Sequence, residues 1–129
     1  MQRGAGRRVK RLIYIDFRSV KVADEALKAS LIAGHFFTPE ELKGEQINTA
    51  LFRIFIEKWL ISRPDVNEKM TILVRQVEAT QCGLPLEVQF FVRNDKNIHY
   101  EHTLADIIEH IYAYTSAFGL TLYQQYPEQ

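Results

Sequence analysis

Three side chains with metal-binding chemistry recur at a fixed spacing near the C-terminal end of the sequence. His102, Asp106 and His110 lie at positions i, i+4 and i+8, with Glu109 beside them. On a helix this spacing places all three on one face, like a row of metal ligands. A zinc ion needs three or four donors at one point, and residues two turns apart on a helix are separated by ~12 Å. We therefore expect a solvated polar face here and no bound metal.

A cysteine and two histidines are the other residues that could support catalysis. Cys82 could act as a nucleophile with His99 or His35 as its base. No third group is placed to orient such a base, and no basic residue stands next to Cys82 to activate its thiol. We expect an unreactive thiol, no enzymatic activity and no cofactor.

The charge balance argues against nucleic acid as a partner. Sixteen basic and sixteen acidic residues give a net charge of zero, which offers no overall attraction for a polyanion. The aromatic stretch QFFVR at 89–93 resembles a strand of sheet-based RNA readers, which stack bases on exposed rings, but the glycine-flanked aromatic signature of those readers is absent. Strand alternation also directs Phe90 to the core. The basic run at 7–11 is typical of a solvated strand start, although next to a membrane-linked segment it could also lie near lipid head groups.

The length and composition fit one globular domain. The chain has 129 residues, of which 47% are hydrophobic, and a single cysteine, so it has no internal disulfide. No stretch approaches the ~18 consecutive apolar residues of a membrane span, and no secretory signal is evident. We expect residues 1–8 to form a flexible leader or truncated linker, residues 9–126 an α+β domain, and residues 127–129 a tail.

Hydrophobic periodicity predicts the elements that position these residues. Alternation of apolar and polar residues predicts strands over 9–17, 71–79, 83–91 and 120–123. Helical spacing predicts helices over 24–33, 48–62 and 100–115, with a short helical piece after Thr38. The helix at 48–62 is apolar over most of its circumference, so we expect Trp59 to be fully buried.

Start and stop signals support these boundaries. Side-chain caps, a proline and glycines mark helix ends in many proteins. The signals in this sequence are Asp24 and Gly34 for the first helix, a capping box from Thr38 to Glu41, Asn48 and Pro64 for the second long helix, and Gly119 after the last.

The order strand, helix, strand, strand, helix, strand predicts a ferredoxin-like split βαβ sandwich. We expect one antiparallel sheet with its helices on one face. The segment 20–47 would be a helical elaboration of the first crossover.

A series of short stretches resembles one family in the same order and at compatible spacing. They are GRRVKRLIYID at 6–16, VKVADEAL at 20–27, NTALFR at 48–53, MTILVRQ at 70–76, GLPLEV at 83–88, YEHTLADIIEH at 100–110 and FGL at 118–120. The series is similar to the C-terminal cytoplasmic region of bacterial small-conductance mechanosensitive ion channels, and most similar to the miniconductance branch.

This resemblance implies a function and a location. It implies a cytoplasmic domain of an inner-membrane channel, a heptamer in which copies of the subunit enclose a vestibule and release solutes on osmotic downshock. The transmembrane helices and barrel domain of that family have no counterpart in the sequence, so we interpret the chain as a cytoplasmic fragment, attached to the membrane only through those missing helices. The alternative that we keep is a free-standing ferredoxin-like regulatory module that binds a small metabolite.

The channel interpretation predicts a subunit interface. The sheet face and edges not covered by helices need partners. The candidate interface residues are Leu12, Tyr14, Phe91, Tyr123 and Tyr126, and the expected partners are other copies of the same subunit.

Overall fold

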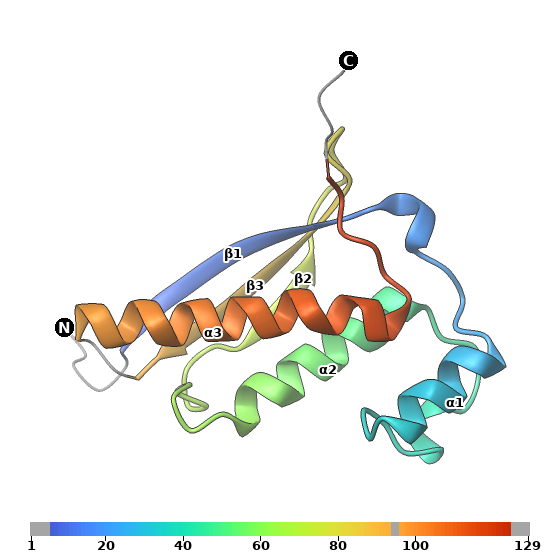
Figure 1. Ribbon diagram of the computed structural model, residues 1–129, viewed down its shortest axis with the longest axis horizontal. Coiled ribbons are helices and arrows are strands. Elements are labelled where there is room, and N and C mark those ends of the chain that lie inside the picture. The colour runs from blue at the N-terminus through green and yellow to red at the C-terminus, as the bar shows by residue number, and fades with distance from the viewer. Residues whose placement is uncertain (1–5, 94–95, 125–129) are drawn as a thin grey trace.

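The computed structural model describes residues 6–93 and 96–124 as an α+β fold (Figure 1). The described residues form a three-stranded antiparallel sheet in the order β1-β3-β2. Helices α2 and α3 pack against the sheet, and α1 lies beyond one end of it. The strands are β1 (Arg7–Ile15), β2 (Leu73–Gln76) and β3 (Leu84–Val92), and the α-helices are α1 (Glu25–Ala33), α2 (Asn48–Ser62) and α3 (Asn97–Thr115).

The central strand β3 follows its sequence pattern. Leu86, Val88, Phe90 and Val92 are fully buried on the face that carries the helices. Residue 83, just before the strand, must be a glycine, because a Cβ atom on Gly83 would lie 2.6 Å from the carbonyl oxygen of Ile15. Gly83 also has φ +96, which other residues rarely adopt. The regular alternation of β3 therefore builds the core.

Aromatic rings join the three helices below the sheet. The fully buried ring of Phe118 lies with its centroid 5.5 Å from those of Phe36 and Phe52, and 5.7 Å from that of Phe55. Most of these contacts are edge-to-face, the arrangement that the ring quadrupoles favour. The left-handed Gly119, with φ 69, turns the chain out of this cluster as expected.

The first helix region confirms two of the expected caps. The carboxylate of Asp24 accepts a hydrogen bond from the Leu27 amide at 2.8 Å. The carboxylate of Glu41 accepts from the amide of Thr38 at 2.8 Å, and the Thr38 hydroxyl accepts from the Glu41 amide at 3.4 Å. This is the capping box, although only the short 3-10 helix Glu40–Leu42 follows it. The left-handed residue after α1 is His35, with φ 64, and not Gly34.

Asn48 has a different role from the one predicted. It is the first residue of α2, after the N-cap Ile47, and its side chain is fully buried. Its amide nitrogen donates to the carbonyl oxygens of Ser19 at 2.9 Å and Phe118 at 3.0 Å, and its Oδ1 accepts from the Lys21 amide at 3.0 Å. One side chain therefore ties three chain segments together.

The predicted second and fourth strands are shorter than expected. The segment 71–79 contributes only Leu73–Gln76 to the sheet. Before Leu73, residues 65–67 occupy the end of β3 through bonds of 2.9 Å from Asn67 N to Phe91 O and from Arg93 N to Asp65 O; after Gln76, Val77 N bonds to Pro85 O at 3.0 Å. In the segment 120–123, Leu122 forms one isolated bridge with Ile15 and no strand. The described residues therefore form an α+β fold with three strands, and the four-stranded ferredoxin-like arrangement stays a prediction.

Helix α2 is less enclosed than predicted. Its buried residues include Leu51, Phe52, Ile56 and Leu60, whereas Trp59 is only partly buried. No helix in residues 6–93 and 96–124 is both long and apolar enough to cross a membrane. Strand β1 begins at Arg7, and the expected tail at 127–129 lies outside the described residues.

Candidate subunit interface

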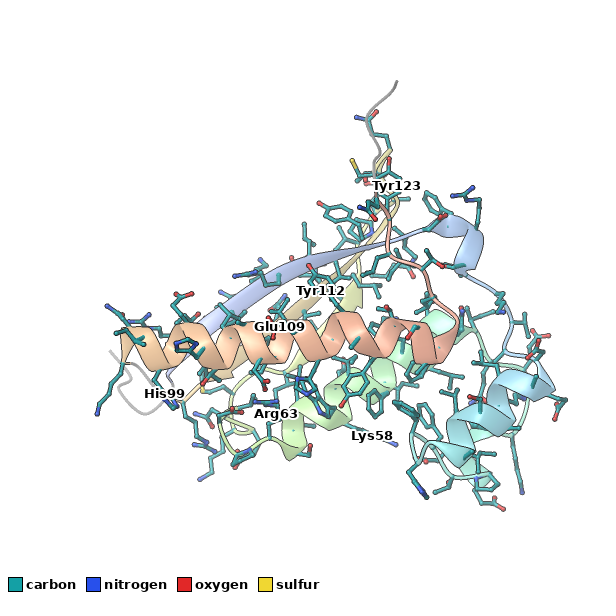
Figure 2. The ribbon with its side chains drawn as sticks, viewed as in Figure 1. Lys58, Arg63, His99, Glu109, Tyr112 and Tyr123 are labelled. Carbon is teal, nitrogen blue, oxygen red and sulfur yellow. The ribbon has the colours of Figure 1, made fainter. Side chains whose placement is uncertain are left out.

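The structure brings three of the predicted interface residues into one groove. Leu12, Tyr14 and Tyr123 line a shallow groove of about 280 Å³, together with Tyr112, Leu122 and Gln124. We call this set the interface groove. Figure 2 labels Tyr112 on α3 and Tyr123 in the segment that follows it, at the end of the sheet. Leu12 and Tyr112 are each 42% exposed, so the groove presents apolar and aromatic surface to solvent.

Backbone hydrogen bonds fix one wall of this groove. The amide of Tyr123 donates to the carbonyl oxygen of Tyr14 at 2.8 Å, and the amide of Asp16 donates to that of Thr121 at 2.8 Å. These bonds hold the C-terminal segment beside the end of β1. The backbone at Tyr14 and Tyr123 is therefore held in place by hydrogen bonds.

The other two predicted interface residues are not in the groove. Phe91 is half-buried and pairs with Arg8, six residues along β1 from Tyr14. At ~3.3 Å per residue, Phe91 and Tyr14 are therefore about 20 Å apart. Tyr126 lies outside the described residues. The interface prediction thus divides into one compact groove and one separate aromatic residue.

The remaining edge of β1 carries positive charge. In an antiparallel strand alternate residues direct their backbone groups to opposite sides. Because Tyr14 bonds outward to Tyr123, Arg8, Lys10 and Leu12 also direct theirs to the open edge. The side chains of Arg8 and Lys10 are exposed. Charged residues on an edge strand discourage the addition of another strand.

A buried carboxylate organises the outer face of the sheet. Glu87 accepts hydrogen bonds from Arg75 Nε at 2.7 Å and Gln89 Nε2 at 2.6 Å, and Lys10 Nζ lies 3.9 Å from it. The hydrogen bond from Arg75 is the main cause that lowers the pKa of Glu87. The Glu87 carboxylate is thus shared between Arg75 and Lys10, and this part of the face offers no free reactive carboxylate.

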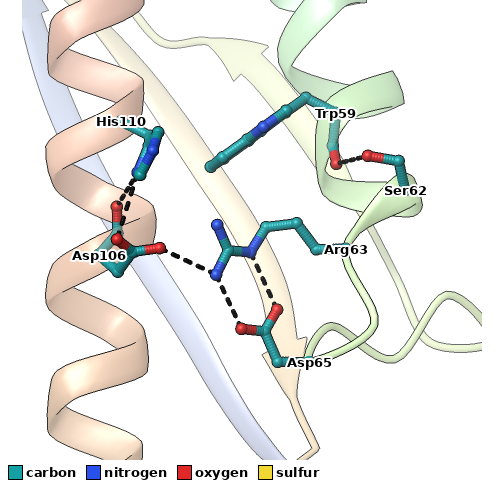
Figure 3. Close-up of polar contacts among 6 residues, drawn as sticks. All are labelled: Trp59, Ser62, Arg63, Asp65, Asp106 and His110. Atoms are coloured by element: carbon teal, nitrogen blue, oxygen red, sulfur yellow. Dashed lines mark hydrogen bonds and ion pairs between the residues drawn. The ribbon is translucent and has the colours of Figure 1, made fainter.

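The predicted polar row on α3 is partly used for packing between helices (Figure 3). Arg63 donates to Asp65 at 2.9 and 2.8 Å and pairs with Asp106 at 3.0 Å. Its guanidinium lies 5.1 Å from the ring centre of Trp59, and the ring of His110 lies 5.6 Å from that of Trp59. The interaction with Arg63 lowers the pKa of Asp65, and Asp65 raises the pKa of Arg63.

This cluster joins α2 to α3 and does not converge on a metal. His102 is exposed on a separate turn of α3. In the described part of the chain no group of three or more His, Cys, Asp or Glu side chains is arranged to hold a metal ion. The cluster is best described as an aromatic and ionic link between two helices.

The cysteine and the two other histidines lie in unrelated places. Cys82 is in the turn before β3, where its amide donates to Thr80 Oγ1 at 3.0 Å. His35 follows α1, and His99 lies in the first turn of α3. No hydrogen bond joins Cys82 to either histidine among the described residues.

The sequence interpretation missed Tyr112 and Leu122 in the groove. Tyr112 follows the buried Ile111 on α3. An aromatic residue outside the row of buried apolar residues was the signal in the sequence that could have identified it. Leu122 was assigned to a strand, which concealed its role as a groove residue. A scan against protein-family models matches no family to this chain.

Proposed function

We propose that the chain is the cytoplasmic vestibule and oligomerisation domain of a bacterial small-conductance mechanosensitive channel. The observation that carries the proposal is the ordered series of family-like stretches, which coincides with the structural framework. GRRVKRLIYID covers β1, NTALFR opens α2, GLPLEV opens β3, and YEHTLADIIEH covers the middle of α3. The resemblance thus extends through the elements that define the fold.

The topology supports the finer, ferredoxin-like assignment. In a split βαβ sandwich the fourth strand pairs with the first, antiparallel to it, at the edge away from the second. The antiparallel bridge between Ile15 and Leu122 lies at this edge of β1. A few more paired residues would complete the four-stranded order.

The surface supports a role in assembly. The interface groove exposes Leu12 and Tyr112 beside Tyr14 and Tyr123, and exposed apolar patches mark interaction sites. The proposed partners are other copies of the subunit around a heptameric ring. On this proposal the domain lies on the cytoplasmic side of the inner membrane, shapes the space that solutes cross, and takes no part in chemistry.

The DNA upstream of the coding segment provides the first test. A contiguous reading frame that encodes hydrophobic spans and a small barrel domain would support the proposal. A true start at Met1 with no such frame would refute it.

Survival of sudden osmotic dilution provides the second test. In the full-length membrane protein, charge substitution of Tyr123 and Tyr126 together is expected to impair ring assembly or survival, because it places charges in the proposed contact. Substitution of Ile98 to Glu places a charge on an exposed residue at the far end of α3 from Tyr112; it serves as a control and should leave both unchanged. If the tyrosine variant assembles and protects cells like wild type, the tyrosines do not form the interface.

One observation favours the alternative of a metabolite-binding module. A groove of about 340 Å³ between α1 and the short helix Glu40–Leu42 is lined by the apolar Ala29, Ile32 and Leu42 and by the charged Glu25, Lys28 and Lys43. Lys28 donates to the carbonyl oxygen of Gly44 at 2.7 Å and Lys43 pairs with Glu40 at 3.0 Å, so a small anionic ligand would bind by replacing these contacts. Such a ligand would raise the unfolding temperature of the chain by mass action. A set of anionic metabolites that produces no shift would remove this alternative.

A further inference from the structure

Helix α2 presents a second apolar surface that the fold does not use. Ile47, Ile54 and Ile61 are 36%, 45% and 54% exposed. They are seven residues apart, nearly two helical turns, so they share one face of the helix. The opposite face carries Phe52, Ile56 and Leu60, which are fully buried. We call Ile47, Ile54 and Ile61 the isoleucine stripe.

The isoleucine stripe and the interface groove lie at opposite edges of the sheet. Glu57 of α2 accepts a hydrogen bond from the Val74 amide of β2 at 2.8 Å, so α2 runs along the β2 edge. The groove is built on β1, the other edge strand. In Figure 1 the segment after α3 rises at the top of the view, whereas α2 runs along the bottom. One copy can therefore present both surfaces at once to two different neighbours.

The charges beside the two surfaces are complementary. Arg53, next to Ile54 on α2, is partly exposed and forms no ion pair within the described residues. Glu109 is exposed one turn before Tyr112 on α3 and forms no ion pair within the described part of the chain. Figure 2 shows Glu109 and Tyr112 on α3. A copy docked at the groove could thus satisfy Arg53 and Glu109 together.

We propose that the isoleucine stripe of one copy docks into the interface groove of the next copy. The proposal rests on the proposed function for its partner, a second copy of this chain. A ridge that fits a groove elsewhere on the same molecule makes a head-to-tail contact, which closes into a ring when the rotation permits. A symmetric pairing of stripe with stripe would leave both grooves exposed and bring two Arg53 side chains together. The charges therefore favour the head-to-tail contact.

Disulfide trapping tests this contact on the chain of 129 residues. Cys82 is first replaced by Ser, so that only introduced thiols react. A variant with both Ile54→Cys and Tyr112→Cys is expected to give a ladder of cross-linked multimers on oxidation, because each copy links to two neighbours. A mixture of the two single variants is expected to give dimers only.

The alternative outcomes each contradict the proposal. If Ile54→Cys alone cross-links as well as the double variant, the contact is symmetric. If the double variant gives no ladder at submillimolar concentration, the two surfaces do not meet. Ile98, which is 77% exposed on α3, belongs to neither surface and provides a matched control.

Charge substitutions give a second readout. In the Tyr112→Cys and Ile54→Cys background, Ile61→Asp is expected to lower the cross-linked fraction by at least about tenfold, since a carboxylate buried in an apolar contact costs more than ~1.4 kcal/mol. Ile98→Asp in the same background should leave that fraction unchanged. An equal loss with Ile98→Asp would place the contact elsewhere.

A charge swap separates this inference from the proposed function. Arg53→Glu and Glu109→Arg are each expected to reduce cross-linking, and the combined variant to restore it. Circular dichroism of each variant checks that it is folded. Restored cross-linking supports the contact even if no channel gene segment lies upstream. If such a segment is found but cross-linking is not restored, the proposed function stands and the contact is refuted.

Discussion

Replacement of Asn48 by alanine tests whether one buried amide holds the fold together. The side chain is fully buried and makes three hydrogen bonds, to Ser19, Lys21 and Phe118. A typical bond of this kind contributes ~0.5–1.5 kcal/mol, and a buried group left without a partner costs ~1–3 kcal/mol. Relaxation and entry of water offset part of the sum. We expect Asn48→Ala to lower the free energy of unfolding by about 2–4 kcal/mol.

Urea titration followed by circular dichroism measures this loss. The control is Gln81→Ala, which removes an amide from an exposed position in the turn before β3. Surface substitutions of this kind change stability by less than ~0.5 kcal/mol. A loss below ~1 kcal/mol for Asn48→Ala, with an unchanged denaturant slope, would show that the three bonds do not support the native state.

Three further predictions concern the link between α2 and α3. Trp59→Ala should cost about 2 kcal/mol in urea titration, less than the ~3–5 kcal/mol of a fully buried tryptophan, because Trp59 is half-buried; a loss above ~4 kcal/mol would contradict this placement. His110→Ala should lower the free energy of unfolding by ~0.5–1 kcal/mol, because it removes the ring contact with Trp59. The matched variant His102→Ala should leave that free energy unchanged, and equal effects of the two variants would refute the contact. Asp65 has its pKa lowered below 3.8 by Arg63, so its ionised form stabilises the fold at neutral pH and this contribution is lost as the pH falls through the folded-state pKa; Asp65→Asn should flatten the loss of stability below about pH 5, and an unchanged acid profile would refute this role.

The sequence predicted best where one local interaction decides the outcome. The cap at Asp24, the box from Thr38 to Glu41 and the left-handed Gly119 depend on neighbouring backbone groups, and all three are confirmed. The core face of β3 is also confirmed, because Leu86, Val88, Phe90 and Val92 are buried, although Glu87 on the other face is buried too.

Prediction failed where distant segments compete. An asparagine at a helix start is usually a cap, but Asn48 bonds to residues far along the chain in both directions. The start of β2 depends on residues 65–67, because they pair with the end of β3. The interface groove likewise combines β1, α3 and the last described segment. Phe91 lies on the same exposed face of the sheet as the groove residues. Only the strand register shows that it lies far from the groove.

The two edges of the sheet restrict how copies can assemble. On the β2 edge, the carboxylate of Glu57 takes the Val74 amide, so a neighbouring strand would have to displace it. On the β1 edge, a symmetric β1 pairing centred on Val9 would place Arg8 opposite Lys10, and like charges directly opposite are destabilising. Both edges therefore disfavour growth of the sheet from copy to copy. In the proposed assembly, contacts between copies would therefore use side-chain surfaces such as the interface groove and the isoleucine stripe.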